Sequence, residues 1–408
     1  MRIVLLSEFY CKGMGYLENI LPKYLARRGV ETHVVATDLP PDYRQQPASR
    51  AYREFSKKLQ PGSVEEHNGY SVHILGHERV MGHMRMAGLR KKLHSIRPDI
   101  VQTMTPIGWI PLEAALLRPF LRYKLFTGCH HHASVFPLAT KKSRLFSLER
   151  FSCTITRTIP GGLVSLETER CYAITSDCSD VAVRFFGVPA KKVEICPLGV
   201  DTDLFYPASS REEMASRSHL RQRLGFADSD IVCVYTGRFS DDKNPELLAR
   251  AVESLSLSGL PYRGLFIGNG AQAEAIACRS GCKTHPFVPV TELSNFYRAA
   301  DIGVWPAQES MSMLDAAACG LPIVVNDTMS APERIEGNGL YYRLNDLADL
   351  IQILQRLHDP VLRRTLGSCG AQKIVRDFSW ASVAERRIRG YEIALSEKKQ
   401  SKVEAVAP

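Results

Sequence analysis

The sequence has no run of about 18 apolar residues, which is the length that a membrane-spanning helix requires. The apolar stretch at its start, MRIVLL, is shorter than the core of a secretory signal peptide and is typical of a first buried strand. With 45% hydrophobic and 23% charged residues, the composition is that of a globular protein rather than a disordered one. We therefore expect a cytoplasmic protein.

The cysteines lack the CxxC pairs that are typical of structural zinc sites and of thiol exchange. There are 11 of them, an odd number scattered along the chain, so reduced and mostly buried thiols are expected. Cys278 and Cys282 would share one face of a helix, but no second ligand pair lies near them in the sequence, which favours packing over metal binding. We expect neither a bound metal nor another cofactor.

The dinucleotide fingerprint GxGxxG is incomplete. Gly13, Met14 and Gly15 follow the first strand, but Glu18 occupies the position of the third glycine. This argues against a nicotinamide-dependent dehydrogenase.

Acidic residues are too few to balance the basic ones, and the formal net charge is +9. Basic clusters interleaved with apolar residues occur at 85–97, 118–124 and 141–157, all in the first half. They fit an anionic membrane surface or a lipid-phosphate acceptor, whereas ordinary solvated helix faces are the alternative. No recognised nucleic-acid-binding module accompanies the charge, so no nucleic-acid partner is expected.

The alternation of strand-like and helical segments predicts an α/β protein with parallel sheets. At 408 residues the chain exceeds one usual core, so we expect two domains, 1–207 and 208–379, facing a central cleft. A helix at 380–396 is expected to close the sequence. Strands are predicted at 2–6, 32–36, 100–104, 123–127, 162–164 and 173–175, and then from residues 231, 264, 284, 302 and 323.

Two cations follow the strand that begins at Ile231. In the segment GRFSDDKN, Arg238 and Lys243 lie on the connection from this strand to the next helix. A helix N-terminus at the carboxyl edge of a parallel sheet favours anions, so this pair suits a diphosphate. An ordinary surface loop is the alternative.

Further candidates in the second half follow later strands. Gly268, Asn269 and Gly270 form a loop in which missing side chains let a ligand approach the backbone. Glu309 and Asp315 flank a small polar turn, where carboxylates can accept hydrogen bonds from sugar hydroxyls. Asp315 could instead sit in the first turn of a helix for its dipole alone.

In the first half, His130, His131 and His132 follow the strand at 123–127, so at least one imidazole could face the cleft as a donor or base. Asp201-Thr202-Asp203 matches the DxD pattern of some metal-dependent glycosyltransferases but lies in the interdomain segment. We interpret it as turn chemistry.

Taken in order, these segments resemble the GT-B glycosyltransferases of family 4, over nearly the whole chain. The matching stretches are GMGYLENILPKYLARRGVETHVV, DVAVRFFGVPAKKVEICPLGVDTDLF, GRFSDDKNPELL, LFIGNGA, PVTELSNFYRAADIGVWP, LDAAACGLPIVV and FSWASVAERRIRGY. The last stretch matches the family's closing helix, so the resemblance implies that the helix at 380–396 packs back on the first domain.

In the second half, the resemblance implies that Arg238 and Lys243 hold the diphosphate of a nucleotide-sugar donor. Asp315 would bind the ribose, and Glu309 would lie next to the transferred sugar. The donor site would also include Gly268, Asn269, Ser312 and Met313.

In the first half, the resemblance implies that His132, or else His130, lies near the donor sugar and that Gly15 lies near the phosphates. Backbone at Phe287 and Val288, in the second half, would face the base.

Three features differ from the family pattern. Five residues separate Glu309 from Asp315, where the family has seven, and the second carboxylate is Asp rather than Glu. The segment SMSML replaces a glycine-rich loop, and Pro286 replaces a glycine near the base.

The resemblance implies a retaining hexosyltransferase that needs no metal and acts on a lipid-linked, polysaccharide or other glycan acceptor, in the cytoplasm or peripherally at the inner membrane face. A nucleotide-sugar epimerase of the same fold and a catalytically inactive sugar-nucleotide-binding protein are the alternatives.

Overall fold

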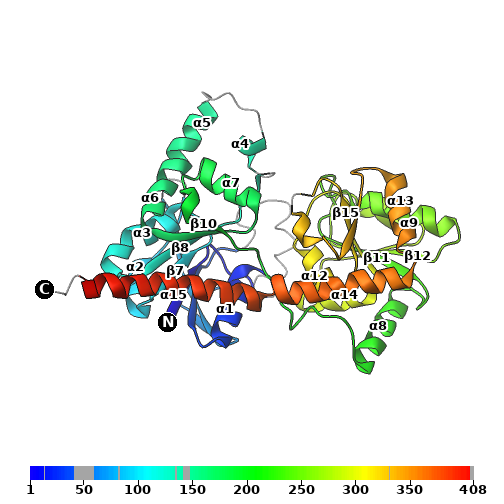
Figure 1. The fold of residues 1–408 in the computed structure, drawn as a ribbon, viewed down its shortest axis with the longest axis horizontal. Coiled ribbons are helices and arrows are strands. Elements are labelled where there is room, and N and C mark those ends of the chain that lie inside the picture. Colours follow the sequence, from blue (N-terminus) through cyan, green and yellow to red (C-terminus); the bar gives the residue numbers. More distant parts are fainter. Residues whose placement is uncertain are drawn as a thin grey trace. The chain divides into compact units, whose positions relative to one another are not determined.

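The computed structural model shows an α/β protein that divides into two compact units (Figure 1). Unit 1 consists of Met1–Leu198 with Val383–Pro408, and unit 2 consists of Gly199–Ser382. The structure describes residues 1–12, 14–40, 59–80, 83–133, 136–140, 148–329 and 331–404.

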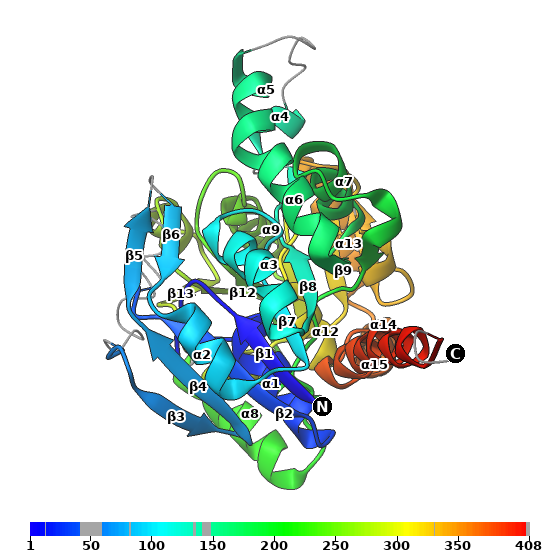
Figure 2. The ribbon, with the colours of Figure 1, turned by 90° about the vertical axis from the view of Figure 1, so that its left-hand side faces the viewer.

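Unit 1 is built on an eight-stranded sheet with the order β10-β9-β8-β7-β1-β2-β4-β3. All neighbours are parallel except β3, which pairs antiparallel with β4 at one edge (Figure 2). The strands of this sheet are β1 (Arg2–Leu6), β2 (Glu31–Thr37), β3 (Val64–His67), β4 (Tyr70–Leu75), β7 (Ile100–Thr103), β8 (Lys124–Cys129), β9 (Thr168–Ala173) and β10 (Val193–Ile195). A separate two-stranded antiparallel sheet consists of β5 (His77–Val80) and β6 (His83–Met86). The helices are α1 (Leu17–Arg27), α2 (Leu89–Ile96), α3 (Trp109–Leu121), α4 (Pro137–Thr140), α5 (Leu148–Cys153), the π-helical η3 (Thr154–Thr158), α6 (Ile159–Glu167), α7 (Ser176–Phe185) and η4 (Ala190–Lys192).

Unit 2 is built on a six-stranded, wholly parallel sheet with the order β13-β12-β11-β14-β15-β16. Its strands are β11 (Ile231–Thr236), β12 (Tyr262–Ile267), β13 (Cys282–His285), β14 (Ile302–Trp305), β15 (Ile323–Asn326) and β16 (Gly339–Tyr342). Its helices are α8 (Arg211–Arg223), α9 (Pro245–Leu257), α10 (Ala273–Ala277), α11 (Val290–Ala299), α12 (Ser312–Ala318), η5 (Pro332–Arg334), α13 (Leu347–Arg356) and α14 (Pro360–Asp377).

The central strands of unit 2 are apolar along their whole length because helices cover both faces of a parallel sheet. Every residue of β11, β14 and β15 is buried, and their side chains form one continuous core with α9, α12 and α13. Because all six strands are parallel, the loops after β11, β12 and β13 leave the sheet at the same edge, and the strand order changes direction between β11 and β14. In doubly wound folds this edge is where ligands bind.

Two strands were wrongly predicted in unit 1. Residues 162–164 lie inside α6, and β9 ends at Ala173, where a strand at 173–175 was expected to begin. The Gly161-Gly162 pair explains the first error, because it serves close helix packing rather than a chain break. A Cβ atom on Gly161 would lie 2.0 Å from the Phe186 carbonyl oxygen.

Helix α15 (Trp380–Glu404) begins in unit 2 and continues in unit 1. In unit 1, the Tyr391 hydroxyl donates to the Gln102 side chain, and the Arg387 guanidinium stacks 4.8 Å from the centre of the Tyr172 ring. Arg387 and Tyr391 are both fully buried. No helix in the described part of the chain has the length and apolar content to cross a membrane.

Candidate functional site

The loop that follows β11 carries the two predicted phosphate-binding cations. The Arg238 guanidinium is 53% exposed and lies 3.3 Å from the Asp242 carboxylate. The Lys243 ammonium is half-buried and donates a 3.0 Å hydrogen bond to the Glu309 carbonyl oxygen. Burial lowers the pKa of Lys243 from its usual range. One cation is thus open to solvent, while the other is fixed to the segment that carries Glu309.

The next loop, after β12, packs directly against the first one. The Phe239 amide donates to the Asn269 carbonyl oxygen at 2.9 Å. A Cβ atom on Gly268 would lie 1.9 Å from the Gly237 carbonyl oxygen, and one on Gly270 would lie 2.3 Å from that of Phe239. The missing side chains therefore make room for the neighbouring loop. Gly268 and Asn269 are brought beside the Arg238 loop, as the predicted donor site requires.

The loop after β13 joins the same edge, because the Gly268 amide donates to the His285 carbonyl oxygen at 3.0 Å. Phe287 and Val288, the residues expected to face the base, follow in this loop. Val288 is buried in the unit 2 core, and Phe287 is half-buried. The three loops therefore form one continuous backbone wall.

Glu309 has a partner that the sequence did not reveal. One of its carboxylate oxygens accepts from the Ala331 amide at 3.2 Å, and the other lies 3.3 Å from an Arg334 guanidinium nitrogen. The Arg334 side chain is only 4% exposed, against 21% for Glu309. The Ala331 amide and the Arg334 guanidinium thus fix the position of the Glu309 side chain, while Lys243 contacts the Glu309 backbone.

The other predicted residues of this segment lie on or beside α12. The Ser312 hydroxyl lies 2.7 Å from that of Ser310 and donates to the Thr236 carbonyl oxygen at 3.4 Å, at the end of β11. Met313 is fully buried in the unit 2 core, so its side chain packs there and does not line an open surface.

The Asp315 side chain, on α12, is partly buried. Burial, with a smaller contribution from the charge of Asp201, raises the pKa of Asp315 to about 8. At neutral pH the group is therefore largely a carboxylic acid, which can donate a hydrogen bond as well as accept one. This suits a hydroxyl-bearing ligand such as a ribose.

In unit 1, Gly15 is exposed on the connection between β1 and α1. Glu18, which interrupts the dinucleotide fingerprint, is buried in the first turn of α1. Burial raises the pKa of Glu18 to about 7. The side chain therefore packs inside the unit, away from the exposed Gly15 backbone.

The three adjacent histidines after β8 lie in different environments. His131 packs edge-on against the Phe186 ring, 5.1 Å between centroids. Burial, followed by the nearby charge of Arg387, lowers the pKa of His130 to about 3, so this ring stays neutral. His132 is 39% exposed, which leaves it the histidine most accessible to a ligand.

Asp177, in the first turn of α7, orients His132. Its carboxylate lies 3.1 Å from Nδ1 of His132 and accepts hydrogen bonds from the Ala133 amide and the Thr175 hydroxyl. Burial opposes ionisation of Asp177, but these hydrogen bonds and the His132 charge outweigh it and lower the pKa of Asp177. An ionised partner at Nδ1 leaves Nε2 of His132 as the atom available to a ligand.

The same place contains three groups that could ligate a metal. Within the described residues, the ligand atoms of His132, Asp177 and Cys178 lie within 4.8 Å of one another. The expectation that the protein needs no metal stays a prediction.

Comparison with solved structures establishes the class of fold. HepE of Anabaena, solved with UDP and glucose, aligns over 95% of this chain and 98% of its own with a TM-score of 0.65 and 16% identity. Two parallel-sheet α/β units and this likeness define the GT-B fold.

Sequence comparison then establishes the family. Residues 20–204 match the family described as Glycosyltransferase Family 4, and residues 230–359 match Glycosyl transferases group 1. The chain belongs to these glycosyltransferases.

Two curated relatives illustrate its neighbours. The D-inositol 3-phosphate glycosyltransferase of Geodermatophilus obscurus is 29% identical over 57% of this chain and 54% of its own. A GDP-mannose-dependent monoacylated alpha-(1-6)-phosphatidylinositol monomannoside mannosyltransferase of Corynebacterium glutamicum is 26% identical over 47% of this chain and 54% of its own. The chain thus spans about half the length of these relatives.

Proposed function

We propose that the protein is a retaining glycosyltransferase that moves a sugar from a nucleotide-diphosphate sugar to a lipid-linked, polysaccharide or other glycan acceptor. The observation that carries the proposal is the position of Arg238 and Lys243. They lie on the loop after β11, at the carboxyl edge of the unit 2 sheet, where it packs against the glycines of the loop after β12. The names of the relatives support transfer of a sugar, and the UDP bound to HepE supports a nucleotide donor.

In this proposal, Arg238 and Lys243 stabilise the negative charge that grows on the departing diphosphate. Electrostatic stabilisation is strongest where the groups are fixed before the reaction, and Lys243 is fixed by the Glu309 carbonyl oxygen. Asp315 binds the ribose. Glu309, positioned by Arg334, accepts hydrogen bonds from the transferred sugar.

His132 contributes from unit 1. With Nδ1 next to Asp177, its Nε2 can contact the donor sugar. The leaving phosphate itself deprotonates the acceptor, so retention needs no protein base in this scheme.

A lipid-linked acceptor would place the reaction at a membrane. We propose that the protein works in the cytoplasm, peripherally on the inner face of a membrane that carries such acceptors. The mannosyltransferase from Corynebacterium glutamicum, whose name contains a phosphatidylinositol acceptor, supports this class.

The donor site is tested by calorimetric titration with a panel of nucleotide sugars. Arg238→Ala and Lys243→Ala should each weaken binding of the best donor by about tenfold or more, because hydrogen bonds to charged groups contribute roughly 1.5–3 kcal/mol. Arg376→Ala is the control, since this arginine of unit 2 is 73% exposed and forms an ion pair with its neighbour Asp377, outside the three loops. Unchanged affinity in the first two variants would refute the proposed donor site.

The reaction is tested by product analysis with and without acceptor. Transfer requires that the donor alone stay intact apart from slow hydrolysis, and that a glycan product form when acceptor is added. An altered nucleotide sugar without acceptor would indicate an epimerase. Tight donor binding with no product from any acceptor tested would indicate an inactive binding protein.

A further inference from the structure

Large apolar side chains point outward along the helix that α5, η3 and α6 form together in unit 1. Their exposed fractions run from 50% to 88%. A surface helix normally places polar residues on its outer face, so this face lacks its usual solvent-compatible side chains. We name these residues the apolar row: Leu148, Phe151, Ile155, Ile159, Leu163 and Leu166.

The spacing of the row places its members on one helix face. Successive members are three or four residues apart, and the 18 residues from Leu148 to Leu166 correspond to five turns of about 3.6 residues each. Side chains with this spacing lie one above the other along a helix, so the row forms one continuous apolar stripe.

The opposite face of the same helix is already packed and cannot exchange with the row. A Cβ atom on Gly161 would lie 2.0 Å from the Phe186 carbonyl oxygen, and the Thr158 hydroxyl donates to the Phe185 carbonyl oxygen at 2.8 Å. Cys153 and Val164 are buried on this side. The row therefore faces outward in the folded protein.

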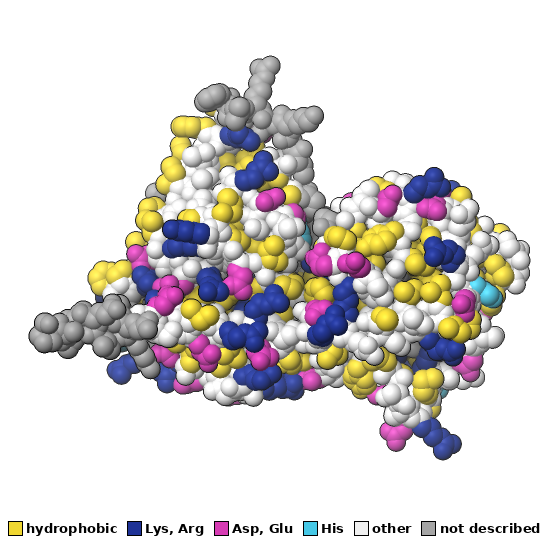
Figure 3. All heavy atoms as spheres, in the orientation of Figure 1, with side chains coloured by type: hydrophobic (Ala, Val, Ile, Leu, Met, Phe, Trp, Pro, Cys, Tyr) yellow, Lys and Arg dark blue, Asp and Glu magenta, His cyan; other side chains and the backbone are white. Residues whose placement is uncertain are grey.

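Helix α3, which packs against α6, extends the apolar surface. Its Leu116 is 63% exposed and its Phe120 is 76% exposed. In the space-filling view, hydrophobic side chains gather along the edge of unit 1 that α5, α6 and α3 form (Figure 3). α5 projects from the sheet of unit 1 in both ribbon views (Figures 1 and 2).

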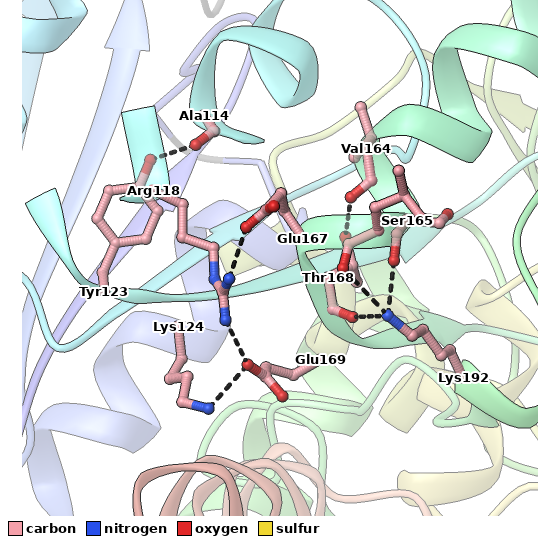
Figure 4. Close-up of polar contacts among 11 residues, drawn as sticks. Ala114, Arg118, Tyr123, Lys124, Val164, Ser165, Glu167, Thr168, Glu169 and Lys192 are labelled. Atoms are coloured by element: carbon pink, nitrogen blue, oxygen red, sulfur yellow. Dashed lines mark hydrogen bonds and ion pairs between the residues drawn. The ribbon is translucent and has the colours of Figure 1, made fainter. Parts of the chain in front are cut away.

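Acidic groups near the end of the row are neutralised. Arg118 contacts Glu167 at 2.5 Å and Glu169 at 2.9 Å, and Lys124 also contacts Glu169 at 2.9 Å (Figure 4). Two cations of the predicted basic cluster at 118–124, Arg118 and Lys124, thus form ion pairs within the protein. Their effect on this surface is to cancel negative charge.

The polar side chains beside the row are compatible with the surface of an anionic lipid bilayer. Arg157 is exposed and Arg150 is half-buried, while Glu149 is the exposed acid on this helix. The hydroxyls of Thr154 and Thr156 donate to backbone carbonyls four residues earlier, at 2.9 and 2.8 Å. Hydroxyls that are already satisfied within the helix cost less to remove from water.

We propose that the apolar row, with Leu116 and Phe120, inserts into the surface of an anionic lipid bilayer and holds unit 1 there. Such a helix lies in the plane of the interface, with its apolar side chains among the acyl chains and its cations at the headgroups. The inference names the surface by which the protein would bind the membrane. It rests on the proposed membrane location and not on the transfer reaction. Residues 141–147, the start of the basic cluster predicted at 141–157, lie outside the described residues.

A second copy of the chain fits this surface less well. In a two-fold dimer the same patch meets itself, so Arg150 and Arg157 of both copies would lie close together. Anionic headgroups instead complement these cations.

The test is co-sedimentation of the full chain with vesicles of equal parts phosphatidylcholine and phosphatidylglycerol. The triple variant Phe151→Ser, Ile155→Ser, Leu163→Ser should bind at least about tenfold more weakly, since each change removes a side chain that would leave water on insertion. The control is Leu257→Ser, Val361→Ser, Val375→Ser, which removes three similarly exposed apolar side chains from helices of unit 2. This control should bind as the unchanged protein does.

Three outcomes would overturn the inference: no binding of the unchanged protein at low salt, equal binding by both triple variants, or a lipid-free dimer that the row variant abolishes. Thermal unfolding of all variants checks that they fold. Vesicle binding needs no donor or acceptor, so loss of this inference leaves the transfer reaction testable, and a failed donor site leaves vesicle binding testable.

Discussion

The candidate residues of the two units are held in place by different means. In unit 2, backbone packs on backbone: the loops after β11, β12 and β13 interlock through glycines and amide hydrogen bonds. In unit 1, a side chain orients a side chain, since Asp177 fixes His132. The first arrangement tolerates almost no added atoms, whereas the second depends on one charge. The two sites should therefore fail in different ways when they are altered.

The largest expected effect is on the backbone wall of unit 2. Gly268→Ala should lower the free energy of unfolding by roughly 2–4 kcal/mol, because the new Cβ atom collides with a carbonyl oxygen and the backbone is in the positive-φ region. Gly259→Ala is the matched control: its φ is also positive, but a Cβ atom there meets nothing within 4 Å. Urea unfolding measures both. Equal losses in the two variants would mean that the contact between the loops contributes nothing.

The next effect concerns the Asp177 carboxylate, which orients His132 in unit 1. Asp177→Asn should lower kcat by about 10-fold or more while KM for the donor changes little, because the variant loses a hydrogen bond to a charged group, which contributes roughly 1.5–3 kcal/mol to the position of His132. Steady-state kinetics gives both constants. NMR of the His132 ring nitrogens should show loss of the single tautomer. If His132→Ala removes further activity of the same size from the Asp177→Asn variant, the two residues act independently and Asp177 does not position His132.

The third effect is a pH dependence of stability in unit 2. The pKa of Asp315 is raised to about 8 in the folded state, so the folded protein holds this proton to higher pH than the unfolded chain does. Stability is then greatest below the ordinary pKa of aspartic acid and falls as the pH rises toward 8. Relative to Asp315→Asn, the unchanged protein should lose stability between pH 5 and pH 8, at up to about 1.4 kcal/mol per pH unit. Parallel stability curves for the two proteins would contradict the raised pKa.

Much of the fold could be predicted from the sequence, because buried parallel strands are continuous apolar runs. β1, β2, β7, β8 and β11 lie where such runs occur. β3 (VEEH) and β5 (HERV) were missed, since charged, exposed edge and hairpin strands have no such pattern.

The candidate site divides in the same way. Arg238 and Lys243 lie on a strand-to-helix connection, as their spacing predicted. Arg334 is 25 residues from Glu309 in sequence, and Asp177 is 45 residues from His132, and both pairs meet only through the fold. Without a local pattern, a single sequence contains no signal for such partners.

Unit 1 is discontinuous in sequence, and this has a consequence for how the protein is made. All of Gly199–Ser382 leaves the ribosome before Val383 does, which takes roughly ten to forty seconds at about 5–20 residues per second. During that time the place later filled by Arg387 and Tyr391 stands empty on an otherwise complete sheet, with Tyr172 and Gln102 uncovered. Unit 2 can fold as it emerges, so the earlier-synthesised unit is the later one to be finished. A nascent chain arrested before α15 would therefore expose an apolar surface that α15 covers in the complete protein. Chaperones bind surfaces of this kind.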